Sequence, residues 1–241
     1  MIVKIFENPK VLGEALGKEF VELVEAKPDA ILGLATGSSP LETYASIVAN
    51  SKKRNVSFSR VTTFNLDEYL SCPIEEETYA SFMKRNLFSQ IDIPLENTHF
   101  PNEKELAIYD DIIEAAGGID LQLLGIGRNG HIGFNEPGTP FDAPTHVVDL
   151  TDSTREANAR FFQNDINLVP KQAVTMGIGT IKKSRRIVLI ASTLDKVAAI
   201  VKLIRGKEDL SCPVTALIHH PAFEVYLTEE VDQAIQAELS K

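Results

Sequence analysis

The sequence has few cysteines, no long apolar run and no surplus of positive charge. Its two cysteines, Cys72 and Cys212, lie far apart and outside any CxxC spacing, so we expect reduced thiols and no disulfide framework. No stretch reaches the roughly 18 consecutive apolar residues that a membrane-spanning helix requires. The N-terminus carries acid and proline where an export signal would have an apolar run. The chain is therefore expected to act in the cytoplasm, with no membrane partner.

Nucleic-acid partners and cofactors are also disfavoured. The net charge is −10 at pH 7, which repels phosphate backbones and argues against a nucleic-acid partner. The sequence has no Walker A motif, no GxGxxG, no HExxH and no clustered cysteine and histidine. We therefore expect no catalytic metal and no cofactor. An anionic small molecule is compatible with this charge, but it needs a local site built from helix N-termini and a few basic side chains. The sequence leaves self-association open.

What the sequence does contain is an alternation of short β-branched runs with longer amphipathic stretches. Several runs are almost continuously apolar, as expected for strands buried on both faces. The alternation predicts a single α/β domain over residues 1–241, with a Rossmann-like, doubly wound, mostly parallel sheet and helices on both faces. The predicted strands are Ile2–Phe6, Ala30–Ala35, Val61–Leu66, Leu121–Ile126, Ala173–Met176, Arg186–Ala191 and Phe223–Leu227.

Helices are predicted from apolar stripes at helical spacing. Leu12, Leu16, Phe20 and Leu23 form one such stripe. Residues 197–204 carry another, and Gly206 after them suits a C-terminal cap. The other predicted helices are residues 41–50, 105–116 and 229–239.

In a doubly wound sheet the ligand lies beyond the carboxyl ends of the strands, so the segments that follow predicted strands are the candidate site. The first is a turn formed by Thr36, Gly37, Ser38 and Ser39, followed by Pro40 and a predicted helix. Glycine permits a close approach of a ligand to the backbone, and a helix N-terminus attracts anions. The turn therefore suits a phosphate group, although an ordinary capped turn would have the same residues.

The second segment is the pair of carboxylates Asp67 and Glu68. Strand interiors disfavour acids, so two acids at the end of an apolar strand are unusual. A partly shielded carboxylate in the crevice is a candidate general base. The alternative is that both acids simply begin a loop.

The third segment, GIGRNGHIGFNEP, has four glycines within residues 125–133 and follows the strongest predicted strand. Glycine density marks a forced backbone path or a close approach to a ligand. His131 lies among these small residues, and Asn129 or Glu136 could hydrogen-bond a ring nitrogen and fix its tautomer. A lone histidine is usually structural, but this setting favours a functional one.

In this order and spacing, TGSSP, FNLDEY and GIGRNGHIGFNEP resemble the glucosamine-6-phosphate deaminase family. The resemblance continues through TDSTREANARFF, VPKQAVTMGIGTI and the segment around Lys196, and so covers nearly the whole chain. It implies a cofactor-free conversion of a phosphorylated amino sugar, glucosamine-6-phosphate, to fructose-6-phosphate and ammonia. The TGSSP motif is shared with phosphogluconolactonases, whereas the histidine motif is highly specific.

The resemblance also implies roles for individual residues. Asp67 matches the base that removes the proton at C2 of the opened sugar. His131 matches the group that moves a proton from the anomeric hydroxyl to the ring oxygen, with Glu136 and Asn129 orienting it. The phosphate is expected on the turn of residues 36–39, reinforced by two basic residues. These are Arg160 and Lys196; Arg160 is preferred to Arg155 because it matches the family's phosphate-binding arginine.

Two departures from the family pattern lead to further expectations. Some relatives have aspartate at the position of Asn129, and an asparagine lends no negative charge, so His131 should be less basic here. The basic cluster that follows FNEP in allosterically regulated relatives is replaced by GTPFDAPTHVVDL. We therefore expect no activation by N-acetylglucosamine-6-phosphate.

Two other functions fit the sequence less well. A 6-phosphogluconolactonase typically has arginine after the acidic motif and an LFPG-like end to the histidine loop, where this chain has Tyr69 and FNEP. A sugar-phosphate sensor of a transcriptional regulator needs an attached helix-turn-helix, for which the sequence leaves no room, and the acidic charge argues against DNA.

Overall fold

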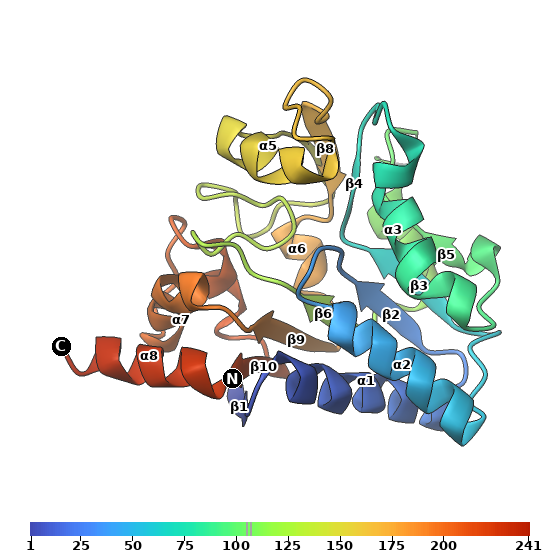
Figure 1. The fold of residues 1–241 in the computed structure, drawn as a ribbon, viewed down its shortest axis with the longest axis horizontal. Coiled ribbons are helices and arrows are strands. Elements are labelled where there is room, and N and C mark those ends of the chain that lie inside the picture. Colours follow the sequence, from blue (N-terminus) through green and yellow to red (C-terminus); the bar gives the residue numbers. More distant parts are fainter. Residues whose placement is uncertain (105, 107) are drawn as a thin grey trace.

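The computed structural model describes residues 1–104, 106 and 108–241, and its centre is a seven-stranded parallel sheet. The strands lie in the order β1-β10-β9-β6-β2-β3-β5 (Figure 1). Every neighbouring pair is parallel, which confirms the predicted α/β class and the mostly parallel sheet. The bounds are β1 Ile2–Phe6, β2 Ile31–Leu34, β3 Thr62–Asn65, β5 Thr98–His99, β6 Leu121–Leu124, β9 Arg186–Ala191 and β10 Phe223–Thr228.

The sequence dictates this sheet through burial. All residues of β2, β6 and β10 are buried, as are five of the six in β9. Strands covered on both faces need apolar side chains pointing both ways, which is why their sequences are mostly apolar, with buried polar exceptions such as Gln122 in β6 and Glu224 in β10. The edge strand β1 keeps several exposed positions. The two-residue β5 was not predicted, since so short a strand has no recognisable period.

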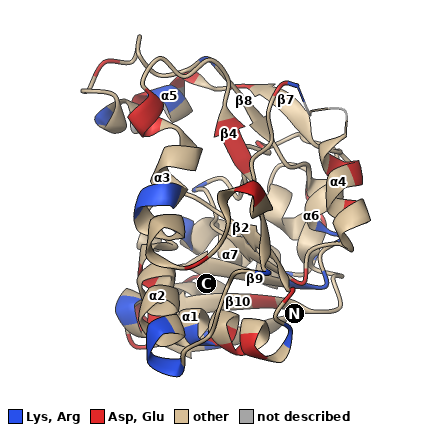
Figure 2. Cartoon of the chain, turned by 90° about the vertical axis from the view of Figure 1, so that its right-hand side faces the viewer, with Lys and Arg blue, Asp and Glu red and all other residues tan. Residues whose placement is uncertain are grey.

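Helices cover both faces of the sheet. Viewed from the side, α1, α2 and α3 lie on one side of the strands, and α4 and α6 lie on the other (Figure 2). Asn8 caps α1 by accepting from the Val11 N–H at 3.0 Å, and Gly206 after α7 has the left-handed φ of 72° that a C-terminal cap needs. The bounds are α1 Pro9–Ala26, α2 Leu41–Arg54, α3 Tyr79–Asn86, α4 Tyr109–Ala116, α5 Asp152–Asn158, α6 Ile178–Ile181, α7 Val197–Ile204 and α8 Glu229–Leu239.

Three of the predicted helices differ in extent from the observed ones. The predicted 105–116 helix includes positions 105 and 107, which lie outside the described residues, and the described α4 starts at Tyr109. Helix α2 continues to Arg54, four residues beyond the predicted end, where Asn55 adopts a left-handed φ of 54°. Helix α1 extends on both sides of the predicted apolar stripe.

A second, three-stranded antiparallel sheet stands above the first, in the order β4-β8-β7 (Figure 1). Its strands are β4 Asp67–Tyr69, β7 His146–Asp149 and β8 Gln172–Thr175. The prediction that residues 173–176 belong to the parallel sheet is therefore wrong: β8 pairs antiparallel with β4 and β7. A separate apolar cluster supports this sheet, formed by Tyr69, Leu150, Phe162, Val169 and Ala173.

The strand order places the candidate segments together. The order in which the chain adds strands to the main sheet reverses between the parallel neighbours β2 and β6. After β2 the chain adds β3 and β5 on one side of this pair, and after β6 it adds β9 and β10 on the other. Ligands of doubly wound sheets bind at such a switch point, beyond the carboxyl ends. The turn after β2, the residues after β3, the histidine loop after β6 and the segment after β9 all begin at this edge. Four adjacent strands span about 15 Å, the size of a phosphorylated sugar site.

Candidate active site

Asp67 stands where the chain leaves the main sheet. β3 ends at Asn65, and β4 starts at Asp67, which pairs with Thr175 of β8 across the small sheet. The Met176 N–H donates to Leu66 O at 2.6 Å and extends this pairing. Asp67 therefore does not begin a loop, as the alternative interpretation had it, but is fixed between two sheets.

The environment of Asp67 favours its protonated form. The residue is only 7% exposed, and burial together with the neighbouring Glu68 carboxylate raises the pKa of Asp67 to about 8. Glu68 itself accepts backbone N–H groups of Tyr69, Tyr79 and Ala80 at 2.8 to 2.9 Å. A carboxylate with a pKa near 8 is a stronger base than an ordinary one and still ionises near neutral pH. Asp67 therefore has the basicity that removal of a carbon-bound proton requires.

The imidazole of His131 lies beside Glu136. Its Nδ1 is 3.3 Å from Glu136 Oε1, and this shielded nitrogen has no other polar partner among the described residues. The contact with the imidazole is the main reason that the pKa of Glu136 lies below its ordinary value. An ionised Glu136 favours the tautomer with the proton on Nδ1, which leaves Nε2 free to accept a proton.

Asn129 acts on this pair differently from the prediction. Its side-chain amide donates to Glu136 Oε2 at 2.6 Å, while its Oδ1 accepts the backbone N–H of His131 at 3.1 Å. The interpretation that Asn129 could hydrogen-bond the imidazole ring is therefore wrong in this structure. Asparagine commonly accepts from the N–H two residues later, and that local bond uses its oxygen. Asn129 instead holds Glu136 in place.

Two glycines of the loop, Gly127 and Gly133, leave room for neighbouring side chains. A Cβ built on Gly127 would lie 2.2 Å from Cε1 and 2.3 Å from Nε2 of His131, so the ring rests directly on the glycine backbone. A Cβ built on Gly133 would lie 2.8 Å from Thr175 Oγ1 and 3.5 Å from Asp67 Oδ2. The open side of Gly133, two residues beyond His131 in the histidine loop, thus faces the carboxylate of Asp67.

The turn after β2 is open at the same edge. Gly37 has a φ of 94° and no atom near its missing side chain, while Ser38 is exposed. Among the described residues, the N–H groups of Gly37, Ser38 and Ser39 donate to no backbone acceptor. The buried Tyr44 fixes the turn, since its hydroxyl accepts the N–H of Ala35 at 3.2 Å. Together with the N-terminus of α2, this turn forms a suitable place for an anion.

Lys196 lies at the start of α7, after the neighbouring strand β9. Its Nζ donates to Asp195 Oδ2 at 2.8 Å, and the Nε of Arg128 contacts the same oxygen at 3.1 Å. Arg128 belongs to the histidine loop, so this contact joins the loop to Lys196. Neither Arg128 nor Asp195 was singled out from the sequence.

Arg160 is placed apart from the turn. It is exposed in the 3₁₀ turn Ala159–Phe161, and its guanidinium lies 4.6 Å from the centre of the Phe161 ring. Arg155, in α5, instead points inwards and donates to Ile166 O at 2.8 Å. The structure thus leaves Arg160, and not Arg155, free to meet a ligand, but no described contact joins Arg160 to residues 36–39.

Two further residues bear on the site and were missed. Thr175 accepts the N–H of Phe134 at 3.0 Å and so ties the histidine loop to the small sheet. Thr154 of α5 donates to Glu136 Oε1 at 3.4 Å. Both lie more than fifteen residues from their partners, and sequence carries no local signal for such contacts.

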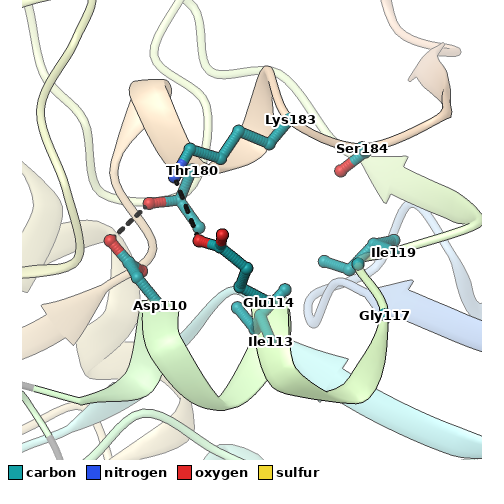
Figure 3. Close-up of a pocket in the computed structure, with 9 residues that line it drawn as sticks. Asp110, Ile113, Glu114, Gly117, Ile119, Thr180, Lys183 and Ser184 are labelled. Atoms are coloured by element: carbon teal, nitrogen blue, oxygen red, sulfur yellow. Dashed lines mark hydrogen bonds and ion pairs between the residues drawn. The ribbon is translucent and has the colours of Figure 1, made fainter.

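The described part of the chain has few features of any other kind of site. No group of three or more His, Cys, Asp or Glu side chains within it could hold a metal ion, and no helix within it could span a membrane. A hollow of about 220 Å³ lies between α4 and α6, lined by Asp110, Glu114 and Lys183 among others (Figure 3). It lies near the residues that lead into β6 and β9, away from the carboxyl edge, and no predicted site residue lines it.

The chain is similar to known proteins over most of its length. The family model described as glucosamine-6-phosphate isomerases/6-phosphogluconolactonase matches residues 7–227. A glucosamine-6-phosphate deaminase of Geobacillus sp. (strain WCH70) is 49% identical over 97% of this chain and 96% of the relative. One of Bacillus pumilus (strain SAFR-032) is 44% identical over 93% and 96%.

Solved structures show the same fold. A monomeric glucosamine-6-phosphate deaminase superposes with a TM-score of 0.92 at 40% identity, covering 97% of this chain and all of that one. A 6-phosphogluconolactonase of Thermotoga maritima has a TM-score of 0.72 at 19% identity, over 94% and 98% of the two chains, and this likeness concerns the fold alone. The resemblance found in the sequence is confirmed: the chain belongs to the glucosamine-6-phosphate isomerase/6-phosphogluconolactonase family.

Proposed function

We propose that this chain is a glucosamine-6-phosphate deaminase, which converts glucosamine-6-phosphate and water to fructose-6-phosphate and ammonia. Relatives that carry this name are 44–49% identical to it over nearly their whole length. One observation of the structure supports the proposal most: Gly133 in the loop of His131 faces the buried carboxylate of Asp67, and the open turn of residues 36–39 follows β2, the strand between β3 and β6.

Ring opening is the first step, and it uses His131. The proton of the anomeric hydroxyl passes to the unprotonated Nε2, and the ring oxygen receives a proton as its bond to C1 breaks. Glu136 supports this transfer, because its carboxylate lies 3.3 Å from Nδ1 and stabilises the imidazolium that forms. Asn129 supports it indirectly by holding Glu136.

Isomerisation and deamination follow. Asp67 takes the proton from C2, next to the aldehyde, and the aldehyde oxygen takes up a proton as the C1–C2 double bond of an enolamine forms. Asp67 then returns a proton to C1, and the nitrogen at C2 loses one as the enolamine becomes an imine. Water adds to the imine carbon, and ammonia leaves with the electron pair of the C–N bond. The raised pKa of Asp67 supports both halves of this transfer, since the carboxylate accepts a proton readily and its acid form donates one near neutral pH.

The phosphate of the substrate is proposed to bind the turn of residues Thr36, Gly37, Ser38 and Ser39. The free N–H groups and the N-terminus of α2 support this placement. Lys196 and Arg160 would complete the site. Arg160 has to leave the ring of Phe161, which is itself 44% exposed, and an exposed cation on an exposed ring is held weakly.

An ammonia-release assay over a panel of phosphorylated amino sugars tests the proposal. The account predicts release from glucosamine-6-phosphate with fructose-6-phosphate formed in equal amount, and no hydrolysis of 6-phosphogluconolactone. Hydrolysis of the lactone without ammonia release would contradict it and select the other activity named in the family description. The absence of activation by N-acetylglucosamine-6-phosphate and the cytoplasmic location stay predictions.

A further inference from the structure

The charged groups around Lys196 have an arrangement that phosphate binding alone does not explain. Asp195 Oδ2 receives both the ammonium of Lys196, at 2.8 Å, and Nε of Arg128, at 3.1 Å. The other oxygen, Oδ1, accepts the hydroxyl of Thr193 at 2.5 Å. A carboxylate therefore lies directly against the lysine that is proposed to bind the phosphate.

We propose that Asp195 is a built-in counter-ion of the phosphate site, whose carboxylate opposes the substrate's phosphate at Lys196 while Arg128 restrains it. This inference rests on the proposed function, because that function assigns the phosphate to Lys196. Asp195 is then a positioning residue that sets affinity, and Arg128 acts on the phosphate only through Asp195.

The geometry supports an opposing role. Two cations that converge on one oxygen form the kind of site that a phosphate oxygen would otherwise occupy. Asp195 fills it from within the chain and stays ionised, since Lys196, Thr193 and Arg128 lower its pKa to about 2. A phosphate that approaches Lys196 meets this negative charge at short range, and like charges in a partly shielded site repel. The side chain of Lys196 is 19% exposed and that of Asp195 36%, so solvent screens part of the interaction.

Arg128 has a distinct part in the arrangement. In the sequence it lies between Gly127, against which the ring of His131 packs, and Asn129, whose side chain donates to Glu136. Its side chain is 85% exposed and contacts Asp195 from the side of the histidine loop. By neutralising part of the carboxylate's charge and drawing it toward that loop, Arg128 reduces the repulsion that a phosphate experiences at Lys196.

The proposed consequence is a limit on phosphate affinity. Substrate and product carry the same phosphate, so tighter binding of it would hold both equally and would lower KM without raising kcat. A counter-ion in the site weakens the binding of the product and of free inorganic phosphate. Asp195 would thereby set KM, and with it the substrate concentrations at which the enzyme works, and would leave the rate of the chemical steps unchanged.

Asp195→Asn tests the inference, since it removes the charge and keeps the shape. For this variant we expect KM for glucosamine-6-phosphate to fall about threefold, the size of effect typical of a partly exposed ion pair, with kcat unchanged. The inhibition constant of inorganic phosphate should fall by the same factor. Glu25→Gln is the matched control: Glu25 pairs with Arg54 at the far end of α2, about 20 Å from the turn, and its loss should change neither constant. A rise in KM for Asp195→Asn would overturn the inference, because it would mean that Asp195 orients Lys196 for the phosphate.

Arg128→Gln separates the indirect role of Arg128 from a direct one. In the wild-type background it should raise KM about twofold, and in the Asp195→Asn background it should change KM by little, because the restrained carboxylate is gone. An equal rise in both backgrounds would show direct contact of Arg128 with phosphate and would overturn its assigned part.

Calorimetric titration with inorganic phosphate makes the test independent of turnover. Tighter binding to Asp195→Asn than to the wild type is expected even if no ammonia is released from any amino sugar, in which case the proposed function alone fails. Equal or weaker binding together with normal ammonia release would overturn the counter-ion and leave the proposed function standing.

Discussion

Asp67 Oδ2 faces the open side of Gly133: a Cβ built on this glycine would be in van der Waals contact with it, at 3.5 Å. Gly133 lies in the loop after β6 of the main sheet, two residues beyond His131, while Asp67 belongs to β4 of the small sheet. The contact exists because β4 pairs with β8, and Thr175 of β8 binds the N–H of Phe134. The small antiparallel sheet is thus the element that brings the proposed base to the proposed proton-transfer loop.

Gly127→Ala should reduce turnover without unfolding the chain. The added methyl would lie 2.2 to 2.4 Å from three atoms of the His131 ring, so the ring must swing away from its place beside Glu136. We expect kcat to fall about tenfold or more, as for other displaced general acid–base groups, with a near-native melting temperature. The matched control is Gly125→Ala, where nothing lies within 4 Å of the new methyl. Equal kinetics for the two variants would show that the ring position does not matter.

The pH dependence of kcat/KM should report Asp67. The base must be ionised to accept a proton, and burial with the Glu68 charge raises the pKa of Asp67 to about 8, so kcat/KM should rise with pH up to roughly that value. Glu68→Gln removes the neighbouring charge and should move this limb to lower pH by about half a unit. The single amide oxygen of the glutamine can still accept the N–H groups of Tyr69 and Tyr79, while the Ala80 N–H loses the acceptor that Glu68 Oε2 provides. If kcat/KM of Glu68→Gln rises over the same pH range as that of the wild type, Glu68 does not raise the pKa of Asp67.

Asp67→Asn should also make the chain more stable at neutral and higher pH. The pKa of Asp67 is about 8 in the folded state, against about 3.9 for an unfolded aspartate. Between these values the folded state binds more protons, so rising pH lowers the free energy of unfolding of the wild type. Asparagine lacks this dependence. The variant should melt on the order of 10 °C higher at pH 8 and nearly equally at pH 4. The pKa difference corresponds to roughly 5 kcal/mol at pH 8, at about 1.4 kcal/mol per unit, and each kcal/mol shifts Tm by roughly 2–4 °C in a chain of this size. A lower melting temperature at both pH values would contradict the assigned pKa.

The main sheet could be predicted from sequence because its strands are buried on both faces. Apolar runs such as residues 31–34 and 187–191 can be recognised without knowledge of their neighbours, and the ends of these runs place the candidate site. Strand β7 is half-buried and ends in an exposed acid, so it shows no such run. The pairing of β4 with β8 depends on residues more than a hundred positions apart, which explains why β8 was assigned to the wrong sheet.

The acid–base residues could be predicted better than the contacts among them. Asp67, His131 and Glu136 each stand out in a motif, and His131 and Glu136 meet in the structure. The bond of Asn129 to Glu136 was not predicted, because either end of an amide can serve a neighbouring group. The contact of Asp195 with Arg128 joins loops from two different strands, β6 and β9, and the register of those strands decides it.

The most direct test of the account is the rate of ammonia release by Asp67→Asn, measured beside the binding of inorganic phosphate to the same variant. If Asp67 takes the proton from C2, turnover should fall by about a thousandfold or more, while the dissociation constant of phosphate stays within about twofold of the wild type. Ammonia release at a rate near that of the wild type would contradict the central claim.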